Sequence, residues 1–171
     1  MLKRAVFSTI SGKITSIKPG RMSDSKQQDC QAAAIRLLSR REHSCKELQQ
    51  KLHSRGFDAG LIDEVLAALQ AENLLSDDRF AESYVRSKVH KGIGPVRLKQ
   101  ELREHQVDDE LIQRYLGEQQ WQQLAAEVRQ KRFGVVLPDN FEERAKQMRF
   151  LQYRGFNAEQ ISSAMKQDDW D

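Results

Sequence analysis

The chain has 171 residues, with 28 Lys and Arg against 25 Asp and Glu, and it contains only three Pro and nine Gly. This composition excludes collagen-like, proline-rich and mainly disordered chains, and no apolar run is long enough to span a bilayer. The many Gln, Glu, Leu and Ala residues and the low aromatic content favour helices over strands.

Residues 1–26 differ from the rest of the chain in charge and in pattern. The first 25 positions hold five basic residues and one acidic residue, so the remainder has a slightly negative net charge. Two runs, 6–10 and 13–17, could pair as a hairpin, although an isolated hairpin is marginal in water. We expect a basic tail that is disordered or forms a short hairpin. Met22 is a candidate for the physiological start, which the intact mass of the native protein would test.

The body of the chain repeats itself about every 50 residues. The segments 48–58, 98–108 and 151–157 share one register, and after each comes an apolar set at helical spacing. A further apolar helix precedes each of these pairs. A period in this range indicates stacked units that bury each other's faces. We therefore expect an elongated all-α protein of three tandem three-helix repeats.

The starts of the predicted helices carry capping signals. Ser44 with Glu47, and Asp139 with Glu142, both fit a capping box. Pro95 suits the start of the middle helix of the second repeat, because Pro is tolerated at the first helical position. The residues that stand just before the last helix of each repeat can accept a hydrogen bond from a free first-turn N–H group: Asp58, Asp108 and Asn157.

The middle helix of each repeat is predicted to end in a turn with left-handed backbone. Gly56 and Gly155 close the first and third of these helices, where a glycine adopts positive φ without penalty. In the second repeat the same place is held by Gln106, for which that conformation costs more. With these boundaries we place the repeats at residues 27–75, 76–118 and 119–168.

Signs of catalysis are weak, and we expect a binding protein without catalytic residues or a cofactor. The sequence has no nucleophile elbow, Walker loop or His-Glu-x-x-His motif, and Gly92-x-Gly94 lacks the third glycine of a dinucleotide fingerprint. Asp77 and Asp78 are explained by a helix start after Ser76, where acidic groups complement the helix dipole.

We expect no metal site and no disulfide. The four nearest candidate ligands lack the spacing of a zinc motif: Cys30, His43, Cys45 and His53. Two cysteines do not form a disulfide framework, and the first residues lack the apolar core of a secretory signal. These features predict a cytoplasmic protein with free thiols.

Basic residues gather in two blocks of the body. Residues 79–103 hold seven basic residues against two acidic ones, and residues 129–154 hold seven against three. Each block could be a solvated helix face, but two dense blocks in a near-neutral body favour a polyanionic partner. Phosphate and an acidic protein surface would satisfy them equally well.

Several strings in the body resemble the RecX family of regulatory proteins. Residues 34–44 look like the start of that family, and Leu75-Ser-Asp-Asp-Arg-Phe-Ala81 and Lys91-Gly-Ile-Gly-Pro-Val-Arg-Leu-Lys-Gln-Glu-Leu102 resemble its most recognisable core. Residues 131–134 and 149–156 resemble its third repeat. The similarity covers about residues 27–167, in the family's order and spacing.

The resemblance implies a function, a shape and a partner. Proteins of this family are non-enzymatic modulators of the RecA recombinase with an elongated, curved body. They bind RecA–single-stranded-DNA filaments, limit filament growth or promote disassembly, and so inhibit ATP hydrolysis, strand exchange and the stimulation of repressor cleavage. Whether such a protein caps filament ends or lies along the groove stays open, as does whether its basic residues face DNA or RecA.

We expect the basic blocks to form the partner surface. Its main part would be Arg79, Arg86, Lys88, Lys91, Arg97, Lys99 and Arg103, and its extension would be Lys131, Arg132, Arg149 and Arg154. Arg79 is the least secure member because it could pair locally with Asp78 or Glu82. We expect a monomer that contacts no membrane. The alternatives are a helical module that binds nucleic acid directly, without RecA, and a scaffold that joins other proteins.

Overall fold

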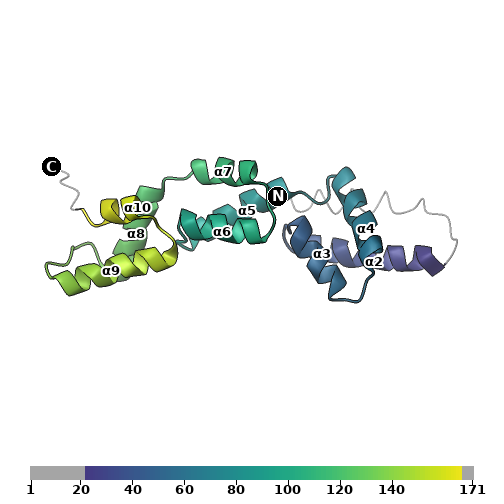
Figure 1. The fold of residues 1–171 in the computed structure, drawn as a ribbon, viewed down its shortest axis with the longest axis horizontal. Coiled ribbons are helices and arrows are strands. Elements are labelled where there is room, and N and C mark those ends of the chain that lie inside the picture. Colours follow the sequence, from purple (N-terminus) through teal and green to yellow (C-terminus); the bar gives the residue numbers. More distant parts are fainter. Residues whose placement is uncertain (1–21, 167–171) are drawn as a thin grey trace.

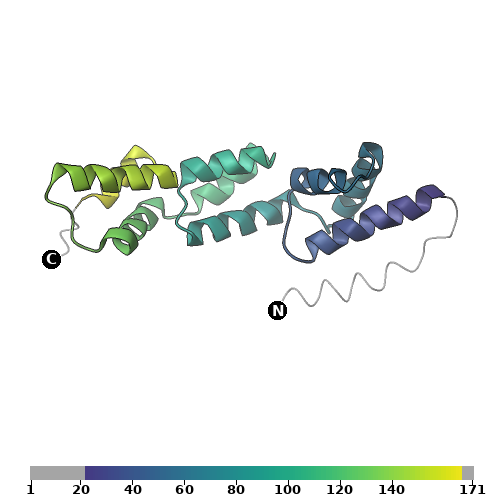
Figure 2. The same cartoon turned by 90° about the horizontal axis from the view of Figure 1, so that it is seen from below.

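The computed structural model describes residues 22–166, and all regular structure within them is helical. The helices are α2 (Met22–Leu38), α3 (Cys45–His53), α4 (Ala59–Ala71), α5 (Asp77–His90), α6 (Pro95–Glu104), α7 (Asp109–Gly117), α8 (Trp121–Phe133), α9 (Phe141–Arg154) and α10 (Ala158–Ala164). They form three three-helix units that follow one another along the long axis of the molecule (Figures 1 and 2). The expected all-α repeat fold is confirmed. Helix α2 begins at Met22, and the expected hairpin in the tail lies outside the described residues.

Local capping chemistry sets most helix starts where the sequence predicts them. The Ser44 hydroxyl accepts from the Glu47 N–H at 3.0 Å ahead of α3, which is one half of the expected capping box, while the Glu47 carboxylate accepts from Arg41. Pro95 is the first residue of α6 after Gly94. Asp58, Asp108 and Asn157 cap α4, α7 and α10. The capping box expected at Asp139 is wrong. Asn140 has an extended backbone and is the N-cap of α9, where its side chain accepts from the Glu143 N–H at 2.8 Å.

The turns that close the middle helices have the expected backbone. Gly56 and Gly155 have φ values of +86° and +92°. Gln106 adopts φ of +56° at the equivalent place, which confirms that the second repeat makes this turn without glycine. The turn geometry therefore follows the repeat register even where the residue type does not favour it.

The described residues bury two separate hydrophobic clusters. One cluster lies wholly within the first repeat, around Leu48 and Leu52. The other runs without a break through the second and third repeats and contains Leu98, Leu102 and Leu151. The equivalent leucines 48, 98 and 151 are each fully buried. The first repeat is therefore packed as a unit of its own, whereas the second and third share one core.

Polar contacts join the first repeat to the second. The Asp77 carboxylate accepts from the Cys45 N–H at 2.8 Å, across the start of α3. The Arg79 guanidinium reaches back to Glu42 at 3.2 Å and to Asn73 at 2.8 Å. The local pairing of Arg79 with Asp78 or Glu82 is thus wrong, because the turn between α4 and α5 brings acceptors from the preceding repeat closer.

The second and third repeats are joined by backbone hydrogen bonds. The N–H of Gly94 donates to the Arg154 carbonyl at 2.9 Å, and the N–H of Val96 donates to the Gly155 carbonyl at 3.0 Å. A Cβ on Gly94 would lie 2.4 Å from the carbonyl carbon and oxygen of Gly155. Glycine is therefore required here for close approach of two backbones. The turn before α6 and the turn after α9 form one rigid junction.

Candidate polyanion-binding surface

The basic residues of the middle block lie on α5, on α6 and in the turn between them, and most are paired with acids. Arg86 pairs with Glu82 at 3.2 Å, and Arg103 pairs with Asp109 at 2.9 Å. Both of these pairs are exposed, so each contributes little to the stability of the fold and leaves its arginine available to a partner. Among the described residues, Lys91 and Lys99 have no ion pair within 4 Å.

Glu101 organises the inner part of the middle block. Its carboxylate accepts from the Tyr84 hydroxyl at 2.9 Å and from Arg97 Nε at 2.9 Å, and it also accepts from Lys88 Nζ. Burial alone would raise the pKa of Glu101, but these hydrogen bonds outweigh it and lower the pKa to about 2. Lys88 also lies over the Tyr84 ring, with Nζ 4.8 Å from its centroid. Lys88 and Arg97 are thus held in place by an ionised carboxylate.

The outer side of α6 presents an open hollow with a basic edge. The hollow has a volume of about 570 Å³ and is lined by Val96, Lys99, Gln100, Arg103 and Glu104. Lys99 and Arg103 are one helical turn apart, so their side chains share a face. The free cation Lys99 therefore stands beside an exposed apolar side chain, Val96.

The basic residues of the third repeat lie at the end of α8 and along α9. Arg132 packs over the Phe133 ring and Arg154 over the Phe150 ring, with 5.8 and 5.2 Å from guanidinium carbon to ring centroid. Lys131 and Arg149 are exposed and make no ion pair within the described residues.

Arg154 connects the two blocks. One of its Nη atoms donates to the Lys91 carbonyl at 2.9 Å, across the junction between the second and third repeats. The structure thereby brings Lys91 and Arg154 together. It places Arg79 apart from them, at the junction with the first repeat.

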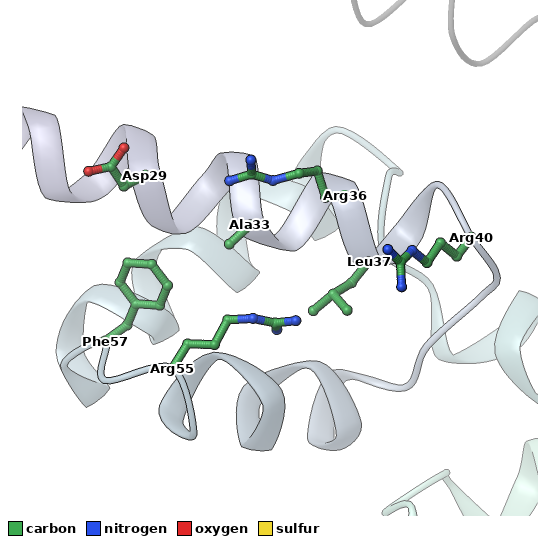
Figure 3. A pocket seen from close by; sticks show the side chains of 7 residues that line it. All are labelled: Asp29, Ala33, Arg36, Leu37, Arg40, Arg55 and Phe57. Carbon is green, nitrogen blue, oxygen red and sulfur yellow. The ribbon is translucent and has the colours of Figure 1, made fainter.

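A basic cluster in the first repeat was missed from the sequence. Arg36, Arg40 and Arg55 surround a hollow of about 440 Å³ whose one acidic lining residue is Asp29. Figure 3 shows the guanidinium groups of Arg40 and Arg55 extending into the space between α2 and α3. The spacing of four residues between Arg36 and Arg40 was a usable signal. Arg55 joins them only through the fold, because it follows a different helix.

The described residues present few groups suited to metal binding or nucleophilic catalysis. They contain no group of three or more His, Cys, Asp and Glu side chains that could hold a metal ion. Both thiols are free, and burial, with a further contribution from Asp77, raises the pKa of Cys45 to about 12. A thiol with such a pKa is a weak nucleophile at neutral pH.

Between residues 22 and 166, no helix has the length and apolar character needed to cross a membrane.

Profiles of a known family match all three repeats. They are described as the first, second and third three-helix domains of RecX and match residues 30–69, 76–116 and 118–165. Regulatory protein RecX of Halorhodospira halophila is 48% identical over 141 residues, which cover 81% of this chain and 88% of that protein. Regulatory protein RecX of Vibrio parahaemolyticus is 41% identical, with 81% and 91% covered.

Solved structures share the arrangement of the repeats. The crystal structure of RecX from Lactobacillus salivarius superposes with a TM-score of 0.69 at 23% identity and covers 82% of this chain and 95% of that one. A second crystal structure of a regulatory protein RecX gives a TM-score of 0.70 at 18% identity, with 91% and 83% covered. At these identities the likeness establishes the fold. Taken with the three matched domains and the close relatives, it shows that the chain belongs to the RecX family of regulatory proteins.

Proposed function

We propose that this protein is a non-enzymatic, cytoplasmic regulator that binds RecA–single-stranded-DNA filaments as a monomer and inhibits RecA. Inhibition would extend to filament growth, ATP hydrolysis, strand exchange and the stimulation of repressor cleavage, and so would modulate DNA repair and recombination. The observation that carries the proposal is the elongated row of repeats (Figure 1) together with the exposed cations that each repeat carries. Membership of a family of regulatory proteins supports it.

The shape of the molecule suits a repeating partner. Contacts that are weak one by one add up through effective concentration when one scaffold presents them together. The backbone hydrogen bonds between Gly94 and Arg154 and between Val96 and Gly155 hold the second and third repeats in one geometry. A filament offers the same binding surface at regular intervals, so an elongated protein with separated basic clusters can contact several of its subunits.

The proposed partner surface consists of eleven basic residues of the two blocks, and the foremost of them are cations that make no ion pair within the described residues. Lys91, Lys99, Lys131 and Arg149 make no ion pair within the described residues, so a partner need not displace an acid to reach them. Arg86, Lys88, Arg97 and Arg103 share their charge with acids of this chain. Arg79, Arg132 and Arg154 complete the surface. Binding should weaken with salt, because exposed charges are screened over about 8 Å at physiological ionic strength.

Replacing Lys91, Lys99 and Lys131 together by Ala should raise the concentration needed for half-inhibition of RecA ATP hydrolysis about tenfold. Three surface charge contacts of about 0.2–1 kcal/mol each account for a change of that size. None of these residues supports the core or an ion pair of the described chain, so the helical circular dichroism should not change. The control removes the same charge elsewhere, by replacing Lys26, Lys46 and Lys146 with Ala. Equal inhibition by the two variants would refute the assignment of the surface.

A direct nucleic-acid-binding module is the alternative function. Such a protein would bind naked DNA tightly, with an affinity that falls steeply as salt rises. Helices α5 and α6 pair most of their basic residues with acids of this chain. That pairing favours the filament as the partner over free DNA.

A further inference from the structure

An open pocket in the third repeat plays no part in the proposed function. It has a volume of about 1030 Å³ and lies between α8, the loop that joins α8 to α9, and the residues that end α10. Arg129 on α8 and Arg144 on α9 line it, and so does Lys166, the last described residue. Asp139 is the one acidic side chain among the described residues of its lining, so the pocket is positively charged.

Arg129 is buried in this pocket without an anion. Its side chain is 3% exposed, and among the described residues it forms no ion pair within 4 Å. Its Nη atoms donate to the Val135 carbonyl at 2.9 Å and to Gln147 Oε1 at 3.4 Å, while Nε has no acceptor in the described part of the chain. Burying a cation without a counter-charge is costly. Desolvation accordingly lowers the pKa of Arg129.

The part of the pocket lining beside Arg129 consists of exposed apolar side chains. Val135 and Val136, in the loop after α8, are 76% and 83% exposed and line the same pocket. Arg144 on the other side donates to the Met165 carbonyl at 3.0 Å, which holds the end of α10 against the pocket. A ligand that fits this arrangement carries a carboxylate for Arg129 and a large apolar group for the two valines.

We propose that the pocket is a docking site for residues 167–171 of the same chain, Gln-Asp-Asp-Trp-Asp, with an aspartate carboxylate on Arg129 and the Trp170 indole on Val135 and Val136. This segment follows directly on Lys166, which lines the pocket. It holds three Asp, one Trp and no basic residue, and so matches the pocket in charge and in apolar character. Five residues reach at most about 17 Å when extended, which is ample for a site that begins at their own anchor. The inference does not depend on the RecA proposal.

The test is nuclear magnetic resonance of the full chain, which holds only two tryptophans, Trp121 and Trp170. The variant Trp170→Phe assigns the two indole N–H signals. We expect nuclear Overhauser contacts between the Trp170 indole and the methyl groups of Val135 and Val136. The triple variant Asp168→Asn, Asp169→Asn, Asp171→Asn removes all three acidic side chains of the segment, and it should weaken these contacts at least severalfold. Arg129→Met should abolish them, and Arg149→Met, which removes a cation outside the pocket, should not.

The Trp121 indole reports on the fold in the same spectra, because its Nε1 donates to the Leu116 carbonyl at 2.8 Å. The triple aspartate variant keeps the test decisive if Arg129→Met fails to fold. A Trp170 indole without contacts to the pocket in the unaltered chain overturns the proposal. So does a contact that persists when Asp168, Asp169 and Asp171 are all neutral. If Trp170 makes no such contact and an oligonucleotide or a foreign acidic peptide shifts the Val135 and Val136 methyl signals, the pocket belongs to that partner instead.

Discussion

Gly94→Ala is expected to lower the free energy of unfolding of the unit formed by the second and third repeats by about 3 kcal/mol, the upper part of the range for overpacked sites. The added Cβ would lie 2.4 Å from the backbone of Gly155, which cannot yield in the way that the end of a flexible side chain can. The clash also opposes the hydrogen bonds from Gly94 and Val96 to the facing turn. For a chain of this length the midpoint of thermal unfolding should fall by about 6–12 °C.

Gly117→Ala is the matched control for this substitution. Gly117 is the last residue of α7, and a Cβ placed there would meet nothing within 4 Å. Its replacement should leave stability unchanged or raise it by up to about 1 kcal/mol, since alanine restricts the unfolded chain more than glycine does. Hydrogen exchange at the amides of residues 94 and 96 should accelerate in Gly94→Ala alone. Similar midpoints for the two variants would contradict the close backbone contact.

Glu101→Gln is expected to destabilise the second repeat by about 2–3 kcal/mol at neutral pH. The pKa of Glu101 falls from 4.5 to about 2 on folding, which corresponds to about 3 kcal/mol at about 1.4 kcal/mol for each tenfold change in the ionisation constant. A neutral amide cannot balance Lys88 and Arg97 together, and Lys88 is mostly shielded from water. Glu104→Gln is the control on the same helix, because within residues 22–166 its exposed carboxylate accepts only from Gln100, at 3.2 Å.

The contribution of Glu101 should vary with pH in a defined direction. The folded state holds the carboxyl in its ionised form, so the stabilisation is fully present above the unfolded pKa of 4.5. It is lost as the pH falls from there toward about 2. The difference in unfolding free energy between the unaltered protein and Glu101→Gln should therefore be largest above about pH 5 and should close at lower pH, as urea titrations at several pH values would measure. A difference that does not change with pH would mean that Glu101 acts through shape alone.

The repeat fold follows from short-range features that the sequence displays openly. The caps at Ser44, Asp58, Asp108 and Asn157 each depend on one side chain and on an N–H group two or three residues away. Such interactions can be predicted without knowing the tertiary structure. The turn at Gln106 was also predictable, because the spacing of the repeats identified the position even though the residue type argues against it.

The partners of the basic residues depend on contacts between distant parts of the chain and could not be predicted. Arg79 pairs with Glu42, which lies 37 positions earlier, and Lys88 shares Glu101 with Arg97. A count of charges along the sequence treats all of these residues as equally available, whereas the fold separates free cations from paired ones. Arg129 is the clearest case. It falls on the buried face of α8 with Trp121 and Ala125, at a spacing of four residues, so the helical pattern did carry a signal of its burial.

Two of the sequence segments that resemble the family contact each other in the structure. The Gly94-Pro95 turn, within residues 91–102, packs against the turn at Gly155, within residues 149–156. This junction explains the residue types of the turn before α6. Gly94 allows the two backbones to approach closely, and Pro95 suits the first position of α6. The resemblance thus identifies the scaffold more directly than the partner surface, which consists of side chains around it.

The most direct test of the proposed function is RecA ATP hydrolysis on single-stranded DNA while this protein is titrated in. The DNA must be in excess, so that competition for DNA cannot resemble inhibition. We expect inhibition at well below one molecule per RecA subunit, because a protein that contacts several subunits acts on the filament as a whole. The absence of inhibition, together with tight binding of the protein to naked DNA, would contradict it and would leave a DNA-binding module on a RecX fold.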